Sequence, residues 1–225
     1  MKDMAAELVA RLNVDTAFTI PIFGGIQIAE SVVISWVVMA VLVLLSLILT
    51  SGMKVWNPGK RQVLAETAVN WLDGFTKDML GPDATEYSEY ISTVLLFIGL
   101  SNIMGLFGMK PPTKDMNVTI ALAVMSIVLI EAAGIRRKGG KGWLKSFTQP
   151  IAIVTPINIL EIFIRPLSLC MRLFGNVLGS FVIMELIEMI LPVALPLVFS
   201  MYFDIFDGFI QAYVFVFLTS LFIAE

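Results

Sequence analysis

The chain alternates between long apolar stretches and short polar ones, and this pattern predicts a bundle of membrane-spanning helices. The 23 residues between Glu30 and Lys54 carry no charge, and as a helix they are long enough to cross a hydrocarbon core of about 30 Å. Two later stretches are similar, so the first three spans are expected at about residues 31–53, 90–109 and 116–135. Glu131, near the end of the third, is within reach of the membrane surface, and we expect no functional role for it.

The segment between the first two spans has a different pattern. Over residues 61–80, apolar side chains recur at helical spacing and polar side chains fill the opposite face. This pattern is typical of an amphipathic helix that lies on the membrane surface. A linker helix folded onto the bundle has the same pattern, so both interpretations stay open.

After Ser146 the chain is almost wholly apolar but is interrupted by charged residues. Either four short spans turn at the charges, or two long helices carry the charges internally. The charged positions lack the Gly and Asn clusters that mark turns, whereas Pro192 and Pro196 mark a break. We therefore expect helices at about 156–191 and 192–224. Each would be about 50 Å long, so both should be strongly tilted in the membrane.

Composition supports an all-α membrane protein with a single domain spanning residues 1–225. Hydrophobic residues make up 58% of the chain and charged residues 15%, whereas a soluble domain carries roughly 25% charged residues. The chain has no histidine, and its one cysteine excludes an internal disulfide. We therefore expect no metal, no cofactor and no nucleic-acid partner. The first 15 residues also lack the basic start and apolar core of a signal peptide.

Charged loops indicate the orientation. Lys54, Lys60 and Arg61 follow the first span, and the stretch RRKGGKGWLK follows the third, whereas the turn after the second span has only Lys110 and Lys114. Positive charge concentrates in cytoplasmic loops. We therefore expect a multi-pass membrane protein with its N-terminus outside and its C-terminus inside.

Arg172 lies deep within the fourth predicted span. An arginine at the centre of a bilayer costs at least ~2.5–3.5 kcal/mol on insertion scales. An internal salt bridge would explain it structurally, although an apolar replacement often serves a bundle as well. Because ionisable residues inside membranes usually mark ion paths, we favour a transport function. At 100° per residue, three small residues share its face: Ser168, Gly175 and Gly179.

Acidic residues occupy other faces of the last two helices. Glu185 and Glu188 lie roughly opposite Arg172 around the fourth span. On the last helix, three polar residues share one stripe at helical spacing: Asp204, Asp207 and Gln211. The acids of the two helices are therefore expected to face each other, while the arginine faces a closely packed partner.

Three stretches near the C-terminus are distinctive: PINILEIFIRP, PLSLCMRLFGN and FDGFIQAYVFVFLT. They resemble, in this order, the lead-in, the signature and the last helix of subunit a of bacterial F-type ATP synthases, the stator of the membrane motor. The resemblance implies a location in the bacterial plasma membrane. NPGKRQVLAETAVNWLDGFTKDML and DMNVTIALAV resemble earlier segments, so the likeness covers nearly the whole chain. The resemblance implies that Arg172 is essential, that Asn176 is its polar neighbour, and that Gln211 faces it from the last helix.

The mechanism implied by the resemblance uses a rotating ring of small subunits, each with a membrane carboxyl group. Two offset half-channels feed the ring, and the arginine prevents ions from passing directly between them. The outer half-channel would be lined by Glu185, Glu188, Asp204, Asp207 and Gln211. Candidates for the cytoplasmic half-channel are Asn158, Glu161 and Ser168, and those for packing against the ring are Gly175 and Gly179.

The chain departs from the family pattern in one respect. Many bacterial members have an acid where this chain has Phe181, and Glu185, one turn further on the same face, is a candidate replacement. Asp204 stands where some members have histidine.

The implied partners are the ring, a membrane subunit of the peripheral stalk, the soluble ATPase head and the lipid bilayer. No nucleotide-binding motif is present, so ATP chemistry is expected on other subunits. A stand-alone cation transporter is the alternative, although no internal repeat supports it. An intramembrane protease using Asp204 and Asp207 fits less well, because both acids lie on one helix turn. The coupling ion is expected to be the proton, with sodium as the alternative.

Overall fold

The computed structural model describes residues 16–20, 26–56, 58–82, 84–148, 155–190 and 195–224. Within these ranges, five helices are long and apolar enough to cross a membrane. This confirms the all-α membrane class predicted from the hydrophobic pattern. A short antiparallel hairpin of β1 (Thr16–Ile20) and β2 (Ile26–Ala29) precedes the helices, and sequence analysis did not predict it.

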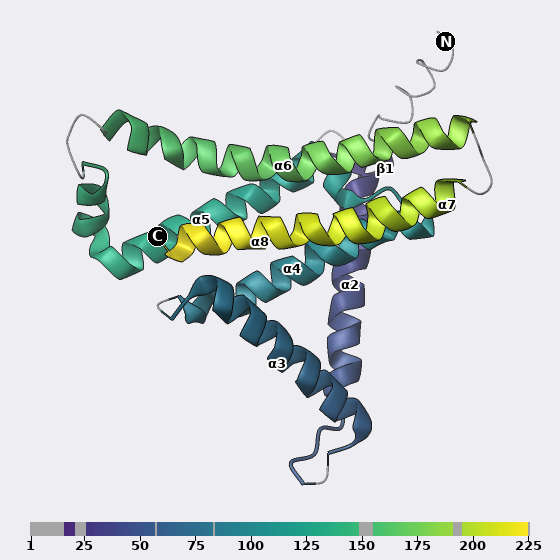
Figure 1. The fold of residues 1–225 in the computed structure, drawn as a ribbon, viewed down its shortest axis with the longest axis horizontal. Coiled ribbons are helices and arrows are strands. Elements are labelled where there is room, and N and C mark those ends of the chain that lie inside the picture. The colour runs from purple at the N-terminus through teal and green to yellow at the C-terminus, as the bar shows by residue number, and fades with distance from the viewer. Residues whose placement is uncertain are drawn as a thin grey trace.

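The first span is α2 (Glu30–Thr50), which runs across the direction of the long helices in Figure 1. Ile34 and Val38 in its first half pack against Met104. Its second half exposes large apolar side chains, among them Leu47 and Ile48. In a membrane-spanning helix, such a surface faces lipid or another membrane subunit.

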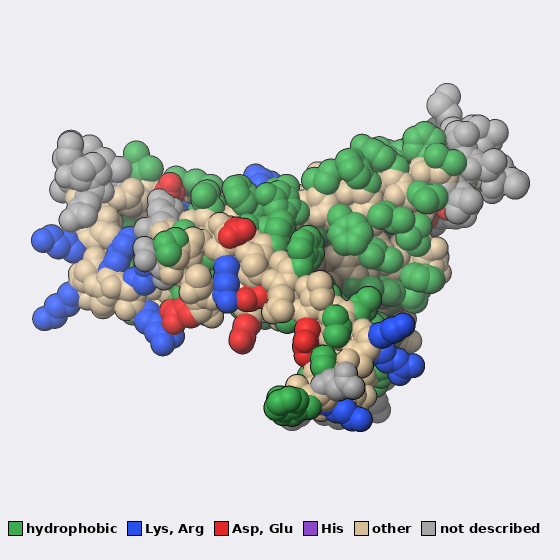
Figure 2. Space-filling view, turned by 60° about the horizontal axis from the view of Figure 1, so that its bottom comes forward, with side chains coloured by type: hydrophobic (Ala, Val, Ile, Leu, Met, Phe, Trp, Pro, Cys, Tyr) green, Lys and Arg blue, Asp and Glu red, His purple; other side chains and the backbone are tan. Residues whose placement is uncertain are grey.

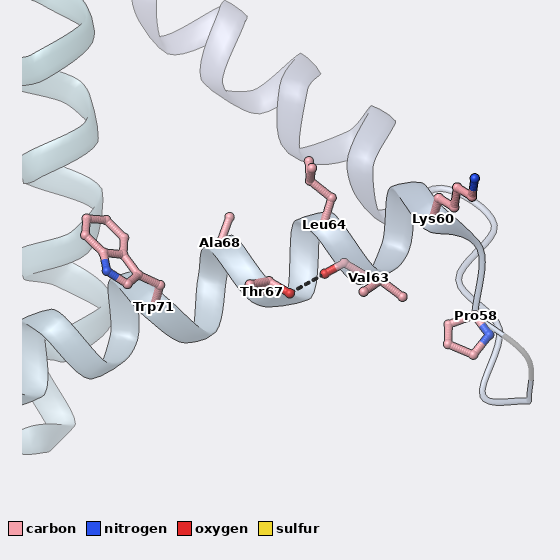
Figure 3. A pocket seen from close by; sticks show the side chains of 7 residues that line it. All are labelled: Pro58, Lys60, Val63, Leu64, Thr67, Ala68 and Trp71. Atoms are coloured by element: carbon pink, nitrogen blue, oxygen red, sulfur yellow. Dashed lines mark hydrogen bonds between the residues drawn. The ribbon is translucent and has the colours of Figure 1, made fainter.

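The amphipathic segment forms α3 (Lys60–Leu80), within one residue of its predicted start. Leu64 and Trp71 are about two-thirds exposed, and Figure 3 shows them beside an apolar groove that runs along α3. Exposed apolar side chains next to a membrane span are the arrangement expected of an interfacial helix.

A hydrogen-bonded cluster attaches the other end of α3 to the start of the second span. Asp73 accepts hydrogen bonds from Lys77 at 2.6 Å and from Ser88 at 2.8 Å. These two bonds hold the pKa of Asp73 below its ordinary value of 3.8, and the bond from Lys77 has the larger effect. Because the folded chain favours the ionised form, this contribution to stability is present above pH 3.8 and is lost as the pH falls through the lowered pKa.

The second and third spans differ in how the helix continues beyond the apolar stretch. The second consists of a 3₁₀ turn (Thr85–Tyr87), α4 (Ser88–Ile103) and a 3₁₀ turn (Met104–Phe107) that ends at Gly108. The third, α5 (Met116–Ser146), continues past the end predicted near residue 135. Arg136, Arg137 and Lys138 are good helix formers, and the helix breaks at Gly139, whose φ is 70°.

The C-terminal third is a hairpin of long helices, as predicted. Its first arm is α6 (Thr155–Ile190). The second arm consists of α7 (Leu195–Ser200), a π-helix (Met201–Asp207) and α8 (Gly208–Ala224). The predicted break at Pro192 lies outside the described residues. In Figure 1 both arms run along the long dimension of the molecule, steeply inclined to α2. The core between the arms and α4 and α5 includes Leu173 and Phe215.

A close contact fixes α8 against α4 where the π-helix ends. The side-chain amide of Asn102 donates a hydrogen bond of 3.0 Å to the carbonyl oxygen of Gly208 and accepts one of 2.8 Å from Thr113. A Cβ atom on Gly208 would lie 2.8 Å from the Cβ of Asn102. The absence of a side chain at Gly208 therefore allows the two helices to approach.

Gly208→Ala should therefore destabilise the bundle, by about 1–3 kcal/mol if it behaves like other overpacked cores. Thermal unfolding of the purified subunit in detergent measures this loss. Gly175→Ala is the matched control, because a Cβ at Gly175 meets nothing within 4 Å. An unchanged unfolding temperature for Gly208→Ala would contradict the packing described here.

Candidate functional site

Four acids predicted to face each other line one cavity of about 540 Å³. This acidic cavity lies between α6, the π-helix and the turn after α4. It contains the predicted residues Glu185, Glu188, Asp204, Asp207 and Gln211. It also contains polar residues that sequence analysis did not select: Asn102, Lys110, Ser180 and Ser200.

Hydroxyl groups hold the two aspartates in the cavity. Ser200 donates a hydrogen bond of 2.5 Å to Asp204, and Ser180 donates one of 3.3 Å to Asp207. A Cβ at Gly105 would overlap the Asp204 carboxylate, so this glycine leaves room for the acid. The two aspartates lie on a π-helix, whereas the predicted stripe assumed a regular α-helix. π-helical turns are rare and often occur at functional sites.

Phe181, the position at which the family often has an acid, also lines the acidic cavity. The ammonium group of the buried Lys114 lies 3.4 Å from the centre of its ring. Glu185 follows one turn later on the same wall. The structure thus places the candidate replacement acid beside the departure from the family pattern.

Asn176 and Gln211 join the two arms of the hairpin at one end of the acidic cavity. The amide nitrogen of Asn176 donates a hydrogen bond of 2.6 Å to the side-chain oxygen of Gln211. Gln211 is 2% exposed, and within the described part of the chain its amide nitrogen has no hydrogen-bond partner.

A second cavity, of about 270 Å³, lies near the other end of the same helices. This mixed-charge cavity contains Asn158 and Glu161, two of the three predicted residues; Ser168 is exposed and is not among the lining residues. Arg165 donates a hydrogen bond of 3.1 Å to Glu161. Pro166 has no N–H for the carbonyl of Ile162, so this oxygen, on a lining residue, is left without its normal helical donor.

Glu131 is a lining residue that sequence analysis set aside. It belongs to the mixed-charge cavity, together with Arg137 and Lys138. Glu131 lies close to the end of the apolar stretch, so the sequence indicated that its side chain reaches the membrane surface. The cavity forms because the chain folds back after Gly139, and the periodicity of α5 contains no signal for this.

Arg172 lies between the two cavities along α6. The mixed-charge cavity reaches Arg165 and the acidic cavity begins at Val177, a separation of about 18 Å along the helix. The side chain of Arg172 is exposed, and added Cβ atoms at Gly175 and Gly179 would meet nothing within 4 Å. The face that carries the arginine is thus open to another molecule.

Comparisons with known proteins agree on one family. The family described as ATP synthase A chain matches residues 32–224. This chain belongs to that family. Subunit a of Moorella thermoacetica is 33% identical over 203 residues, which are 90% of this chain and 92% of the relative. The sodium ion specific subunit a of Propionigenium modestum is 32% identical over 215 residues, covering 88% and 74%. A Bradyrhizobium subunit a is 32% identical over 201 residues, or 89% of each chain.

Membership of the ATP synthase A chain family, together with the five apolar helices, makes this chain a multi-pass membrane subunit. The segment with the β-hairpin, residues 16–29, lies before the matched range, whereas both cavities lie within it.

Proposed function

We propose that this chain is the ion-translocating stator subunit of an F-type ATP synthase. The observation that carries the proposal is the position of Arg172, on an open face between two polar cavities at opposite ends of one helix hairpin. The acidic cavity serves as the outer half-channel, and the mixed-charge cavity as the cytoplasmic half-channel.

The distribution of charge supports this orientation. The cytoplasmic assignment places the basic stretch 136–145, next to the mixed-charge cavity, on the same side as the turn between α2 and α3. In Figure 2, Lys and Arg side chains gather at the left-hand end and at the lower right, while hydrophobic side chains cover a broad area on the right. The positive-inside rule then puts the C-terminus inside, and the membrane proposed from the family resemblance is the bacterial plasma membrane.

The open face suits a ring of small subunits, each with a carboxyl group. Gly175 and Gly179 allow a neighbouring helix to approach closely, and the guanidinium of Arg172 remains charged at any accessible pH. A charged guanidinium stabilises a deprotonated carboxylate beside it and disfavours an ion-loaded one. Ions that enter one cavity must therefore travel round with the ring before they leave through the other.

Asn176 and Gln211 would close the inner end of the outer half-channel. Their hydrogen bond lies one turn from Arg172 and joins the two arms of the hairpin at that end of the acidic cavity. ATP chemistry belongs to the soluble head, which this stator reaches through the peripheral stalk, so the chain is not an enzyme by itself. Proton coupling is the proposal, and sodium coupling the alternative, because one relative is named sodium ion specific.

Glu185→Gln should impair ion entry several-fold more than Glu188→Gln. Glu185 is partly buried one turn beyond Phe181, whereas Glu188 is exposed near the end of α6. Glutamine keeps the shape and polarity but removes the titrating charge. ATP-driven ion pumping by assembled complexes in vesicles measures the effect. A larger defect in Glu188→Gln, with Glu185→Gln near the parent, would place the channel acid on the other residue.

Isolation of the complex separates the stator proposal from the stand-alone transporter. The tagged chain is expected to co-purify with a ring of small membrane subunits and a soluble ATPase. A chain that purifies without them and transports cations alone after reconstitution would refute the proposal.

A further inference from the structure

The segment after the break in α5 forms a wall of the mixed-charge cavity. Gly139 turns the chain, and the following residues connect α5 with the start of α6. Ser146 donates a hydrogen bond of 2.6 Å to the carbonyl oxygen of Trp143, and Asn158 donates one of 2.9 Å to that of Phe147. The wall is thereby attached to α6, and Figure 1 shows it at the left-hand end of the molecule.

Trp143, a residue of this wall, holds the side chain of Glu131 in place. The ring nitrogen of Trp143 donates a hydrogen bond of 2.8 Å to a carboxylate oxygen of Glu131. The indole packs on α5 at Gly134, where an added Cβ would lie 3.4 Å from its Cδ1 atom. Phe147 contacts the indole edge to face, with ring centres 4.8 Å apart. The position of the Glu131 side chain is therefore defined by packing as well as by a hydrogen bond.

The charged groups around Glu131 are engaged in different ways. Glu161 accepts from the guanidinium of Arg165, which also lies over the ring of Phe222. Arg137 donates to the last carbonyl oxygens of α8, those of residues 223 and 224. The donor to Glu131, in contrast, is the neutral indole of Trp143, which forms a hydrogen bond with the carboxylate without neutralising its charge.

We infer that Glu131, positioned by Trp143, is an ion-accepting group of the cytoplasmic half-channel; this inference rests on the proposed function. The cavity has room for several water molecules. A carboxylate on its wall takes up a proton from water and returns it, or binds a sodium ion and releases it. Glu131 thus exchanges the coupling ion between cytoplasmic water and the path towards Arg172.

The test measures passive ion flux through assembled membrane sectors from which the soluble head has been removed. Glu131→Gln should lower the flux several-fold, and Glu131→Asp should restore much of it because the carboxylate is kept. Varying pH at fixed sodium and sodium at fixed pH identifies which ion the carboxylate accepts. Glu86→Gln is the matched control, since this acid lies near the same end of the bundle, 3.7 Å from Arg136, and lines neither cavity.

Trp143→Phe tests the positioning role, because phenylalanine keeps an aromatic ring but has no N–H donor. It should change the pH or sodium dependence of the flux while leaving the yield of complex unchanged. A profile identical to that of the parent would show that the indole does not position the acid.

Chemical labelling tests the site without relying on activity. In a Cys170→Ser background, Glu131→Cys should react with a membrane-impermeant thiol reagent added from the cytoplasmic side and not from the outside. Parental flux in Glu131→Gln, or no labelling from the cytoplasmic side, would overturn the inference about Glu131. If Arg172 and Glu185 variants are also without effect on ion pumping, the proposed function itself fails; if those variants are defective, it stands.

Discussion

Arg172→Lys is expected to abolish ion-coupled ATP synthesis and ATP-driven pumping, although it keeps a positive side chain. Once the proposed ring covers the open face, the cation at this position would be enclosed by protein and lipid. A lysine ammonium readily loses its proton on burial, whereas a guanidinium does not, and its compact charge does not reproduce the planar donor array. The variant therefore loses the permanent charge that holds each ring carboxylate in its deprotonated form.

The measurement is ATP-driven ion uptake into vesicles that contain equal amounts of assembled complex. Arg136→Lys is the matched control, because Arg136 is exposed and its ion pair with Glu86 lies outside both cavities. Near-normal pumping by the Arg172→Lys complex would refute the role assigned to the guanidinium.

The helices could be predicted from the sequence because hydrophobic length is a strong local signal. Glu30 and Lys54 are the charged residues at the two ends of an uncharged apolar stretch, and α2 occupies nearly all of this stretch. The two long helices of the hairpin were also predictable, because the charges at Glu161 and Glu185 come without turn residues. The structure of the chain beyond each apolar stretch was harder to predict. The extension of α5 to Ser146 is an example.

The sequence predicted which acids line the acidic cavity, but not how they are placed within it. A helical wheel assumes 3.6 residues per turn, and the π-helix around Asp204 changes the phase of the stripe. The hydroxyl partners Ser180 and Ser200 were not selected, because serine within an apolar helix is usually a packing residue.

The surroundings of Glu131 could not be predicted from the local sequence. Its environment depends on a contact with Trp143, twelve residues away beyond the break at Gly139. The apolar pattern specifies which residues are inside the membrane, but it contains no information about a segment that folds back. Only the three-dimensional structure brings the indole and the carboxylate together.

Arg172→Ala is expected to increase passive ion flux, whereas a blocked channel would decrease it. Without the guanidinium, an ion-loaded ring site can pass between the two cavities, about 18 Å apart along α6. Each charge that crosses would dissipate ~2.3 kcal/mol per 100 mV without driving rotation. The membrane sector should therefore become leaky, while assembly of the complex is preserved because Arg172 is exposed on this chain.

Passive ion flux in vesicles with the head removed tests this separation most directly. Vesicles are given a membrane potential, and the flux through the Arg172→Ala sector is compared with that through the parent and through an Arg136→Ala control. The flux should be faster in Arg172→Ala than in either, and it should return to a low level when Glu185→Gln is added to block the acidic cavity. A flux no faster than that of the parent, at equal assembly, would contradict the claim that Arg172 separates two half-channels.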